Sequence, residues 1–466
     1  MTKTYKDKIL DSLKDKEPKK EKPIYTASFD DLVDLVENDG EVKFLTFDGE
    51  LYGSRIIDEK TYLPPEKVDW ALPKADIVLE EYKKHTDVSD DSDGVQGCRY
   101  CQKELYPIIL DYFKLFSEPP TEHHYHFLVW MAFHSYLIEK FNFSPILFLV
   151  ATKDRGKTPT LKALSYIARR GIFTETFREA NLIRWSSNYK ASLFFDVRNF
   201  PRKVEQSNSE DLIFGRAERG VTSSRVLHPE KGAFKDMVTF STFGVTGATS
   251  NRMVDAITEA RCIVFNMPYS PRVFEVEPTE EMGLPLKEKL TAFRMAHFNT
   301  QFLEIKKELP GKLENYLRGY HKMIKTIFPL YEKEFSIFKK IVTEQKLEEA
   351  ESSFEAKIIK IVLSLRELVE EGGLCLTYDD ICNEYNRGKS ERLIDERAMS
   401  SILKGLGFST KRNKEGNKRG IFYDEDFIDK LKINYGLENI EVHPLTTSET
   451  SEVSENEEIK PDEIPF

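Results

Sequence analysis

The sequence has no apolar run long enough to cross a membrane. Its most apolar stretch, residues 126–150, is interrupted by Glu139 and Lys140, so neither half reaches the roughly 20 residues that a spanning helix needs. The lysine-rich N-terminus lacks the apolar segment of a secretory signal. Cysteine is scarce, with five in 466 residues, which argues against a disulfide framework and is typical of a reducing compartment. We therefore expect a cytoplasmic protein without a membrane partner.

Basic residues are fewer than acidic ones, 68 against 79, and they are unevenly distributed along the chain. The net charge of −11 by itself disfavours a nucleic-acid partner. Residues 437–466 carry nine acidic side chains and one lysine, whereas residues 404–420 carry six basic side chains and one glutamate. The average therefore hides a basic patch near the C-terminal end.

Residues 24–86 predict a small α/β module. Residues 28–38 have the spacing of a short helix that begins at Ser28. Residues 41–47 and 50–57 alternate as strands around Asp48-Gly49, which predicts a hairpin. A polar run after His85 is typical of a linker.

The middle of the chain predicts a strand followed by a phosphate-binding loop. Residues 146–150 are five apolar residues, and residues 151–158 read ATKDRGKT. This matches the pattern GxxxxGK[ST] except that Ala151 replaces the first glycine, which is tolerable where the backbone is not left-handed. An amphipathic helix follows, with Pro159 in its first turn, where proline is accepted. The alternative is a chance GKT in a surface turn.

A loop of this kind binds a nucleoside triphosphate, which we take to be ATP, together with Mg²⁺. Backbone N–H groups at the start of the helix would hold the phosphates. Lys157 would reach the β- and γ-phosphates, and Thr158 would be a ligand of the magnesium. The residues that we expect to hold the nucleotide are Thr152, Lys153, Asp154, Arg155, Gly156, Lys157 and Thr158.

A second apolar strand ends in an aspartate. Residues 193–196 read LFFD, so Asp196 is positioned to support the magnesium, although a strand-capping aspartate is the alternative. The next residue is Val197, where a hydrolytic glutamate usually stands. Glu205, Glu210 and Asp211 follow on the next segment and could orient the attacking water instead.

These motifs, in this order, resemble the AAA+ helicase-like ATPases of phages, plasmids and integrative elements, over residues 106–267. The resemblance implies a ring of subunits, with Asn251 as a sensor and Arg261 reaching a neighbour's γ-phosphate. It also implies a hairpin over residues 216–244 that touches nucleic acid in the channel. Its contact residues would be Lys231 at the tip, Arg225 and Lys235. Each of these roles has a simpler alternative. Asn251 could be only a turn residue, Arg261 could be the partner in a surface ion pair, and the hairpin could be a solvated charged turn.

Residues 354–426 resemble a winged helix. The helix over residues 396–406 would lie in the major groove of DNA, and basic residues on the following hairpin would contact phosphates. Winged helices also serve as protein-docking modules, so this alternative stays open. The expected phosphate contacts are Lys411, Arg412, Lys414, Lys418 and Arg419.

The last residues resemble the acidic tip of bacterial single-stranded DNA-binding proteins. In such a tip the terminal phenylalanine fills an apolar pocket and acidic side chains meet a basic rim. We expect this tail to bind host replication or repair proteins, with a solubilising tail as the alternative. Its residues here are Asp462, Glu463, Ile464, Pro465 and Phe466.

Cys98 and Cys101 have the spacing of a zinc-ligand pair. Structural zinc sites usually combine such a pair with a second closely spaced pair. The histidines that follow, His123, His124 and His126, stand at the start of an apolar helix. The sequence therefore does not assign zinc to these cysteines.

Together these features predict an α/β protein with a P-loop AAA+ core. We expect this core to consist of a parallel sheet covered on both faces by helices, preceded in the chain by a helical lead-in. Its expected function is that of an ATP-dependent DNA-binding ATPase, a replication helicase or initiator of a bacterial mobile element. Val197 and Ala151 motivate the alternative of a scaffold protein that binds nucleotide without hydrolysing it, and a signalling NTPase without nucleic acid is a third class. The expected parts are a disordered charged arm (1–23), an N-terminal α/β module (24–86), a polar linker (87–104), the ATPase core (105–283), a helical region (284–351), the winged helix (352–430) and a disordered acidic tail (437–466).

Overall fold

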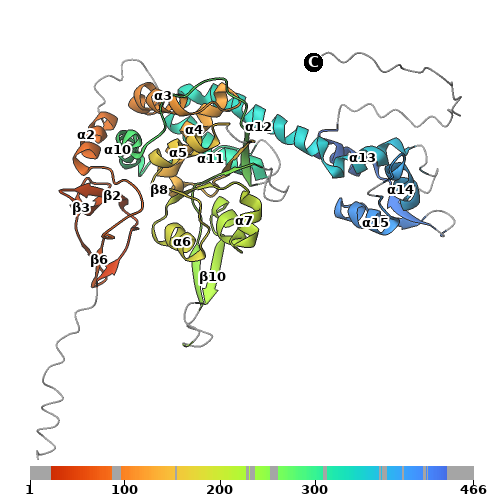
Figure 1. Ribbon diagram of the computed structural model, residues 1–466, viewed down its shortest axis with the longest axis horizontal. Coiled ribbons are helices and arrows are strands. Elements are labelled where there is room, and N and C mark those ends of the chain that lie inside the picture. Colours follow the sequence, from red (N-terminus) through yellow and green to blue (C-terminus); the bar gives the residue numbers. More distant parts are fainter. Residues whose placement is uncertain are drawn as a thin grey trace, which may run out of the picture. The chain divides into compact units, whose positions relative to one another are not determined.

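The computed structural model divides into two compact units, residues 1–340 and 341–466. Figure 1 shows the helices and strands of both units. No helix in the described part of the chain is both long and apolar enough to span a membrane. The residues that the structure describes are 23–86, 96–152, 155–226, 230, 237–251, 261–307, 312–366, 369, 375–390, 393–412, 416 and 418–437.

The N-terminal module consists of two small sheets and one helix. One sheet has the strand order β1-β6-β5, and the other is antiparallel with the order β2-β3-β4. Its elements are β1 (Ile24–Tyr25), β2 (Leu32–Asn38), β3 (Glu41–Thr46), β4 (Leu51–Tyr52), β5 (Arg55–Ile57), β6 (Lys60–Leu63) and α2 (Ala75–Thr86).

The helix expected over residues 28–38 is wrong, because this segment contains strand β2. The first five residues of β2 are all buried, and a strand buried on both faces has no alternating pattern to distinguish it from a helix. The Asp-Gly turn after this segment indicates a β-hairpin more clearly than the apolar spacing indicates a helix. Asp39 and Gly40 both have positive φ, 54° and 80°, which is the backbone of the tight turn that joins β2 to β3.

The centre of the first unit is a parallel sheet of five strands in the order β13-β7-β12-β9-β8. The expected parallel sheet is thereby confirmed. Its strands are β7 (Ile146–Val150), β8 (Gly171–Thr174), β9 (Ser192–Asp196), β12 (Thr246–Ser250) and β13 (Cys262–Asn266).

Helices cover both faces of this sheet (Figure 1). On one face, Leu161 of α5 packs so closely on Gly247 that an added Cβ would lie 2.8 Å from the leucine Cδ1. On the other face, the ring of Phe200 in α7 lies 5.6 Å from Phe148 and 5.9 Å from Phe195. The helices on and around the sheet are α5 (Lys157–Ile167), α6 (Glu179–Ile183), α7 (Phe200–Gln206) and α8 (Glu210–Phe214).

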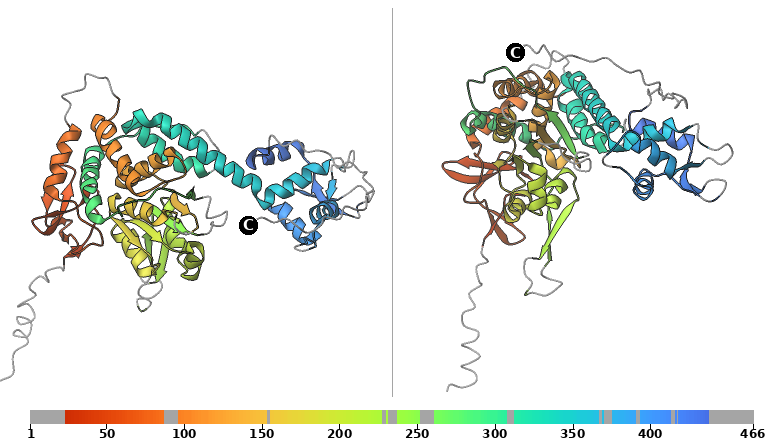
Figure 2. Two further views of the ribbon diagram at one scale, coloured as in Figure 1. Left: turned by 45° about the horizontal axis from the view of Figure 1, so that its top comes forward. Right: turned by 45° about the vertical axis from the view of Figure 1, so that its right-hand side comes forward.

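Further helices precede and follow the sheet in the chain. The lead-in consists of the π-helical turn η2 (Cys101–Leu105), α3 (Tyr106–Phe116) and α4 (Glu122–Tyr136). α10 packs against both α2 and α5, and Figure 2 shows α10 running beside α2. The helices that follow the sheet are α10 (Glu280–His297), α11 (Lys312–Ile327) and α12 (Glu332–Ser352).

The expected hairpin between the aspartate strand and the next strand of the sheet is present. It is formed by β10 (Thr222–Val226) and β11 (Met237–Ser241), which pair antiparallel. Lys231 and Lys235, expected near its tip, lie outside the described residues.

The second unit contains a three-stranded antiparallel sheet of order β14-β16-β15 and a separate core of its own. Met399 and Leu403 of α15 are fully buried in that core. The elements follow one another as helix, strand, two helices, hairpin and helix: α13 (Phe354–Ser364), β14 (Cys375–Thr377), α14 (Tyr378–Asn386), α15 (Glu396–Gly405), β15 (Thr410–Arg412), β16 (Arg419–Phe422) and α16 (Glu425–Asn434).

An ion network that is buried around Asp34 and reaches the surface at Glu139 connects the N-terminal module to the rest of the first unit. Asp34 of β2 accepts from Arg169 Nε at 3.1 Å and from Arg170 Nε at 2.5 Å. Glu139 in turn accepts from Arg169 at 2.6 Å and from Arg294 at 2.8 Å. Burial by itself raises the pKa of Asp34, but the positive charges of the arginines outweigh burial and lower it. The aspartate is therefore held ionised.

Replacing this aspartate should destabilise the first unit. We expect Asp34→Asn to cost about 3–5 kcal/mol of unfolding free energy at pH 7, since it leaves buried arginines without their counter-charge. Urea unfolding followed by tryptophan fluorescence measures this, because Trp70, Trp130 and Trp185 all belong to the first unit. The matched control is Asp31→Asn, which breaks a partly exposed ion pair with Arg55 and should cost less than about 1 kcal/mol.

The same comparison has a defined pH dependence. The folded-state pKa of Asp34 lies below its unfolded value, so its contribution is present above about pH 4 and is lost as the pH falls further. The difference between the parent protein and Asp34→Asn should therefore shrink below about pH 4. A difference that is equally large at pH 3 and pH 7 would contradict this account.

Candidate functional site

The carboxyl ends of the central strands bring together residues that are far apart in the sequence. Ser250 of β12 is in register with Val150 of β7, and Thr249 is in register with Asp196 of β9. Because the three strands are parallel, the segments that leave them emerge at the same edge of the sheet. This edge is where ligands bind in open parallel sheets.

The loop after β7 has the backbone that a phosphate loop needs. Gly156 has a left-handed φ of 72° and is the N-cap of α5, a conformation that favours glycine. Thr160 N donates to the Gly156 carbonyl at 3.2 Å and so closes the first turn of the helix. Ala151 does not have a positive φ, which explains why alanine is tolerated there. The N–H groups of the first turn of α5 thus face the loop.

Lys157 lies across this loop and is largely buried. Its Nζ donates to Asn251 Oδ1 at 2.6 Å and to the Thr152 carbonyl at 3.0 Å, and also to the Ala151 carbonyl. These neutral acceptors hold the ammonium group where the phosphates of a nucleotide would lie. A phosphate is a stronger acceptor for an ammonium group and can replace them.

Asp196 accepts two hydroxyl hydrogen bonds at the end of β9. Thr158 Oγ1 donates to one carboxylate oxygen at 2.8 Å, and Thr249 Oγ1 donates to the other at 2.5 Å. A hydroxyl and a carboxylate are hard oxygen ligands of the kind that Mg²⁺ prefers. Thr158 and Asp196 therefore fit a magnesium ion as the sequence predicts.

The loop, the aspartate and the neighbouring segments enclose a cleft of about 720 Å³. Basic side chains outnumber acidic ones on its walls, which suits a polyanionic ligand. Arg155 and Lys157 come from the loop, whereas Arg198 and Lys203 come from the segment after β9. The remaining lining residues are Gly156, Thr158, Pro159, Glu175, Asp196, Val197, Thr249 and Asn251.

Glu175 is a member of this cleft that the sequence reasoning missed. It follows β8, and Thr174 pairs with Phe195 of β9, so Glu175 and Asp196 leave neighbouring strands side by side. The signal was available, because Glu175 is the first residue after an apolar strand segment. Because β8 has only four residues and is incompletely buried, its sequence does not stand out as a strand that would place Glu175 at this edge.

The acids that we expected to replace the missing glutamate lie elsewhere. Glu210 and Asp211 line a separate pocket of about 430 Å³. Asp211 also accepts from Ser223 and from Arg225. Glu205 does not line the cleft around Lys157.

The other residues expected at the nucleotide site are partly placed. Asn251 is brought to Lys157, as described, and Arg155 lies 5.1 Å from the ring centre of Tyr269. Lys153 and Asp154 lie outside the described residues. Arg261 precedes β13 and lines the pocket of Glu210; its carbonyl accepts from Ile146 N at the start of β7. It therefore lies at the edge of the sheet opposite to its own phosphate loop.

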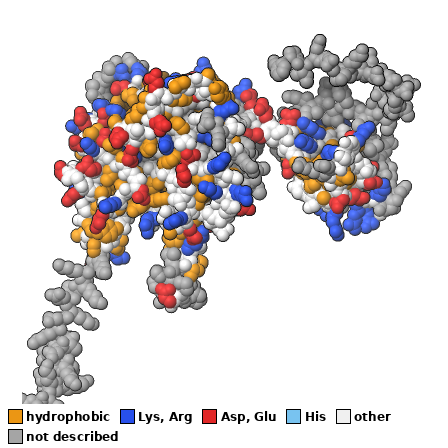
Figure 3. All heavy atoms as spheres, in the orientation of Figure 1, with side chains coloured by type: hydrophobic (Ala, Val, Ile, Leu, Met, Phe, Trp, Pro, Cys, Tyr) orange, Lys and Arg blue, Asp and Glu red, His pale blue; other side chains and the backbone are white. Residues whose placement is uncertain are grey.

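The described basic residues that we expect to contact phosphates lie on the β15–β16 hairpin and beside it, and Figure 3 shows Lys and Arg side chains gathered on this unit. Arg412 and Arg419 are paired directly across the two strands, and both are exposed. Lys418 is paired with Asp379 at 3.0 Å. Lys411 lies 4.6 Å from the ring centre of Phe422.

Arg225 on the other hairpin is held by Glu179 and Asp211. Several expected contact residues lie outside the described part of the chain. They are Lys414 and the five residues of the tail, Asp462, Glu463, Ile464, Pro465 and Phe466.

No family model and no curated protein matches this chain. Among solved structures, it is similar to the C-terminal region of NrS-1, with a TM-score of 0.32, 12% identity, and coverage of 80% of this chain and 82% of that chain. It is also similar to the SCCmec type IV Cch helicase, with a TM-score of 0.37, 10% identity, and coverage of 91% and 83%. A structure of JCV helicase gives a TM-score of 0.25 at 13% identity, with coverage of 58% and 72%. A likeness at this level carries no information on function.

Proposed function

We propose that this protein is an ATP-dependent, DNA-binding ATPase of the AAA+ type that acts as a replication helicase or initiator of a bacterial mobile element. The observation that carries the proposal is the convergence of Lys157, Thr158, Asp196 and Asn251 at one edge of a parallel sheet. Each of these side chains has the chemistry that a magnesium nucleotide requires at that place.

In this proposal Lys157 and the N–H groups of the first turn of α5 bind the phosphates. Thr158 and Asp196 hold the magnesium, which supplies electrostatic stabilisation of the charge on the transferring phosphoryl group. Asn251 is already within 2.6 Å of Lys157 Nζ. Its amide is therefore close enough to respond to the γ-phosphate, which is the sensor role that the resemblance implies.

Glu175 is our candidate for the acid that positions the attacking water. Val197 occupies the usual place of this acid and is buried, so it supplies no proton acceptor. Glu175 leaves the adjacent strand at the same level as Asp196 and lines the same cleft. A carboxylate there can accept a proton from water, as a general base does.

The proposed assembly is a homo-oligomeric ring. Arg261 lies at the edge of the sheet away from its own loop, next to an open pocket. In that position it would serve a neighbouring subunit's nucleotide rather than its own. The β10–β11 hairpin, with Arg225, Lys231 and Lys235, would face nucleic acid in the channel.

We propose that the second unit is a winged helix that binds DNA. The face of α15 that carries Arg397, Ser401 and Lys404 is exposed and has the helical spacing of a single stripe. Small and basic side chains along one stripe suit a helix that enters a groove. Arg412 and Arg419 add like charges directly opposite each other on the wing, an arrangement that destabilises a hairpin unless an anion lies between them.

The tail residues 462–466 would bind host replication or repair proteins through the terminal phenylalanine and its acidic neighbours. A second candidate function is supported by Val197. If Glu175 does not act as the base, the protein would bind ATP and assemble on DNA without turnover, as a scaffold that presents this tail.

ATP turnover in the presence and absence of single-stranded DNA tests the proposal. We expect turnover that DNA stimulates, and we expect Glu175→Gln to reduce it by at least about 10²-fold while nucleotide binding persists, because the substitution removes the proton acceptor but keeps the shape. Glu205→Gln is the matched control and should leave the rate unchanged. Binding without turnover in the parent protein would support the scaffold function instead, and equal rates for the parent and Glu175→Gln would exclude Glu175 as the base.

Salt-dependent DNA binding tests the wing. The double substitution Arg412→Ala, Arg419→Ala should weaken binding, and it should reduce the slope of log K against log salt concentration by about 1.4–1.8, because two phosphate contacts are lost. Lys430→Ala, Lys432→Ala removes the same charge from α16 and serves as the control. If the two double variants change the slope equally, the wing has no special role and the protein-docking alternative is favoured.

A further inference from the structure

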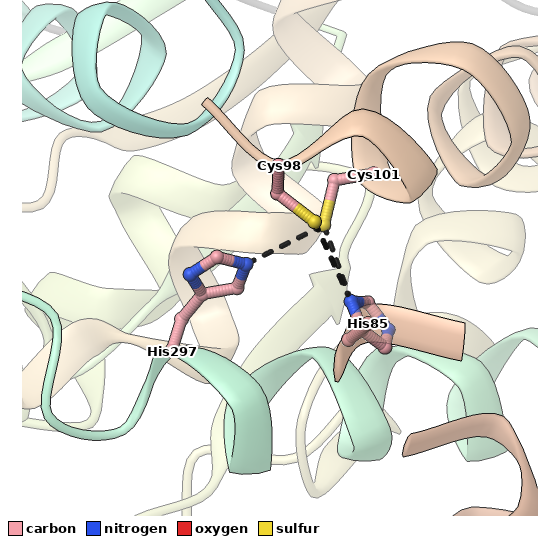
Figure 4. Close-up of side chains that lie close together, drawn as sticks. All are labelled: His85, Cys98, Cys101 and His297. Carbon is pink, nitrogen blue, oxygen red and sulfur yellow. Dashed lines mark hydrogen bonds between the residues drawn. The ribbon is translucent and has the colours of Figure 1, made fainter. Parts of the chain in front are cut away.

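Four potential metal ligands converge away from the nucleotide cleft. They are His85, Cys98, Cys101 and His297, and their ligand atoms all lie within 4.8 Å of one another. Figure 4 shows the four side chains directed toward a common point from α2, the start of the lead-in and the end of α10. We propose that they form a structural zinc site.

The distances fit a single tetrahedral ion. Cys101 Sγ lies 3.4 Å from His85 Nδ1 and 3.4 Å from His297 Nε2. Cys98 Sγ lies 3.7 Å from His85 Nδ1. A zinc ion with bonds of about 2.3 Å to sulfur and about 2.0–2.1 Å to nitrogen places its ligand atoms roughly 3.3–3.8 Å apart. The ion therefore fits between these atoms with little movement of the side chains.

The ligand set selects the metal and its role. Two thiolates and two imidazoles suit zinc and disfavour magnesium or calcium, which prefer oxygen. All four positions of the tetrahedron come from the protein, so no position remains for a substrate or a reactive water, as is usual in structural sites. A redox-active cysteine pair is the other use of this spacing. It needs no further ligands, whereas here the ring nitrogens of His85 and His297 lie beside the two thiols and complete a set of four.

Neighbouring groups hold both imidazoles in place. His297 Nδ1 lies 3.2 Å from Thr300 Oγ1, a hydrogen bond that leaves Nε2 facing the thiols and supports its role as a ligand. The His85 ring packs edge-on against Tyr100, with the ring centres 4.7 Å apart. Phe293 lies next to His297, with ring centres 4.8 Å apart. These ring contacts restrict the rotation of both imidazoles.

The segment that carries the cysteines packs against the C-terminal end of α11. Gly97 has a φ of +84°, and a Cβ there would lie 2.7 Å from the carbonyl oxygen of Ile327 in α11. The N–H of Cys98 donates to the same carbonyl at 3.2 Å. Only glycine combines a positive φ with the absence of a Cβ at this close approach. Gly97 therefore positions the cysteine pair beside the two histidines.

The proposed ion would fasten the N-terminal module to the helices around the sheet. His85 ends the module in α2, and His297 ends α10, roughly two hundred residues later in the chain. α10 also packs on α5, the helix that begins with Lys157. A metal that joins such distant segments contributes directly to folding, since the unfolded chain offers no preformed site.

Metal analysis of the full-length protein tests the site. We expect about one zinc per chain in protein purified without added metal, and less than roughly a tenth of that in Cys98→Ser, Cys101→Ser, because two of the four ligands are lost. The matched control is Cys375→Ser, Cys382→Ser, which alters two buried cysteines of the second unit and should keep the zinc. A tetrahedral cobalt spectrum with thiolate charge-transfer bands in the cobalt-substituted parent would support the ligand set without any variant.

Three results would overturn the proposal. The first is parent protein that lacks zinc after growth in zinc-supplied medium. The second is a Cys98→Ser, Cys101→Ser variant that retains its zinc. The third is a disulfide between Cys98 and Cys101 in the parent protein, which would identify a redox pair. If the variant does not fold, release of one zinc from the parent by a thiol-reactive mercurial, with a lower unfolding midpoint by tryptophan fluorescence, supports the site, and release of none contradicts it.

Discussion

Hydrogen bonding between the parallel strands β7, β12 and β9 decides which side chains meet at the carboxyl edge of the sheet. Thr249 is in register with Asp196, and Ser250 is in register with Val150. This register fixes where the loops that follow the three strands begin. The proposed nucleotide site is a consequence of this register. A shift by one residue in β9 would turn Asp196 toward the opposite face of the sheet, and Thr158 would lose its partner.

The parts of this arrangement that are local in the sequence could be predicted. A short apolar strand, the loop with its Gly-Lys-Thr end and an amphipathic helix specify one another through neighbouring residues. The features that the sequence did not predict depend on contacts between segments that are far apart in the chain. β2 has no alternation because both of its faces are covered, and the ligands of Cys98 and Cys101 come from α2 and α10 rather than from the histidines next in sequence. Glu175 follows a strand whose place beside β9 is set only by the sheet.

Among the contacts between the N-terminal module and the rest of the first unit, the ion network around Asp34 and the proposed metal cluster differ in kind. Asp34 and its arginine partners are buried charges that must remain paired because water is excluded from them, whereas the side chain of Glu139 is partly exposed. The cluster of His85, Cys98, Cys101 and His297 would add a metal-mediated link at the C-terminal end of α10. Both involve residues of α10, and α10 packs on the helix that carries Lys157. The module is therefore connected to the proposed nucleotide site through α10, and it contributes no residue to the lining of that cleft.

Equilibrium titration with a fluorescent ATP analogue and Mg²⁺ tests the central claim most directly, because it requires neither hydrolysis nor DNA. We predict one nucleotide per chain, weaker binding when magnesium is removed, and a loss of at least about tenfold in affinity for Lys157→Ala, equivalent to about 1.4 kcal/mol. Lys162→Ala, on the same helix but outside the cleft, should bind as the parent protein does. Binding that is unaffected by Lys157→Ala would contradict the account.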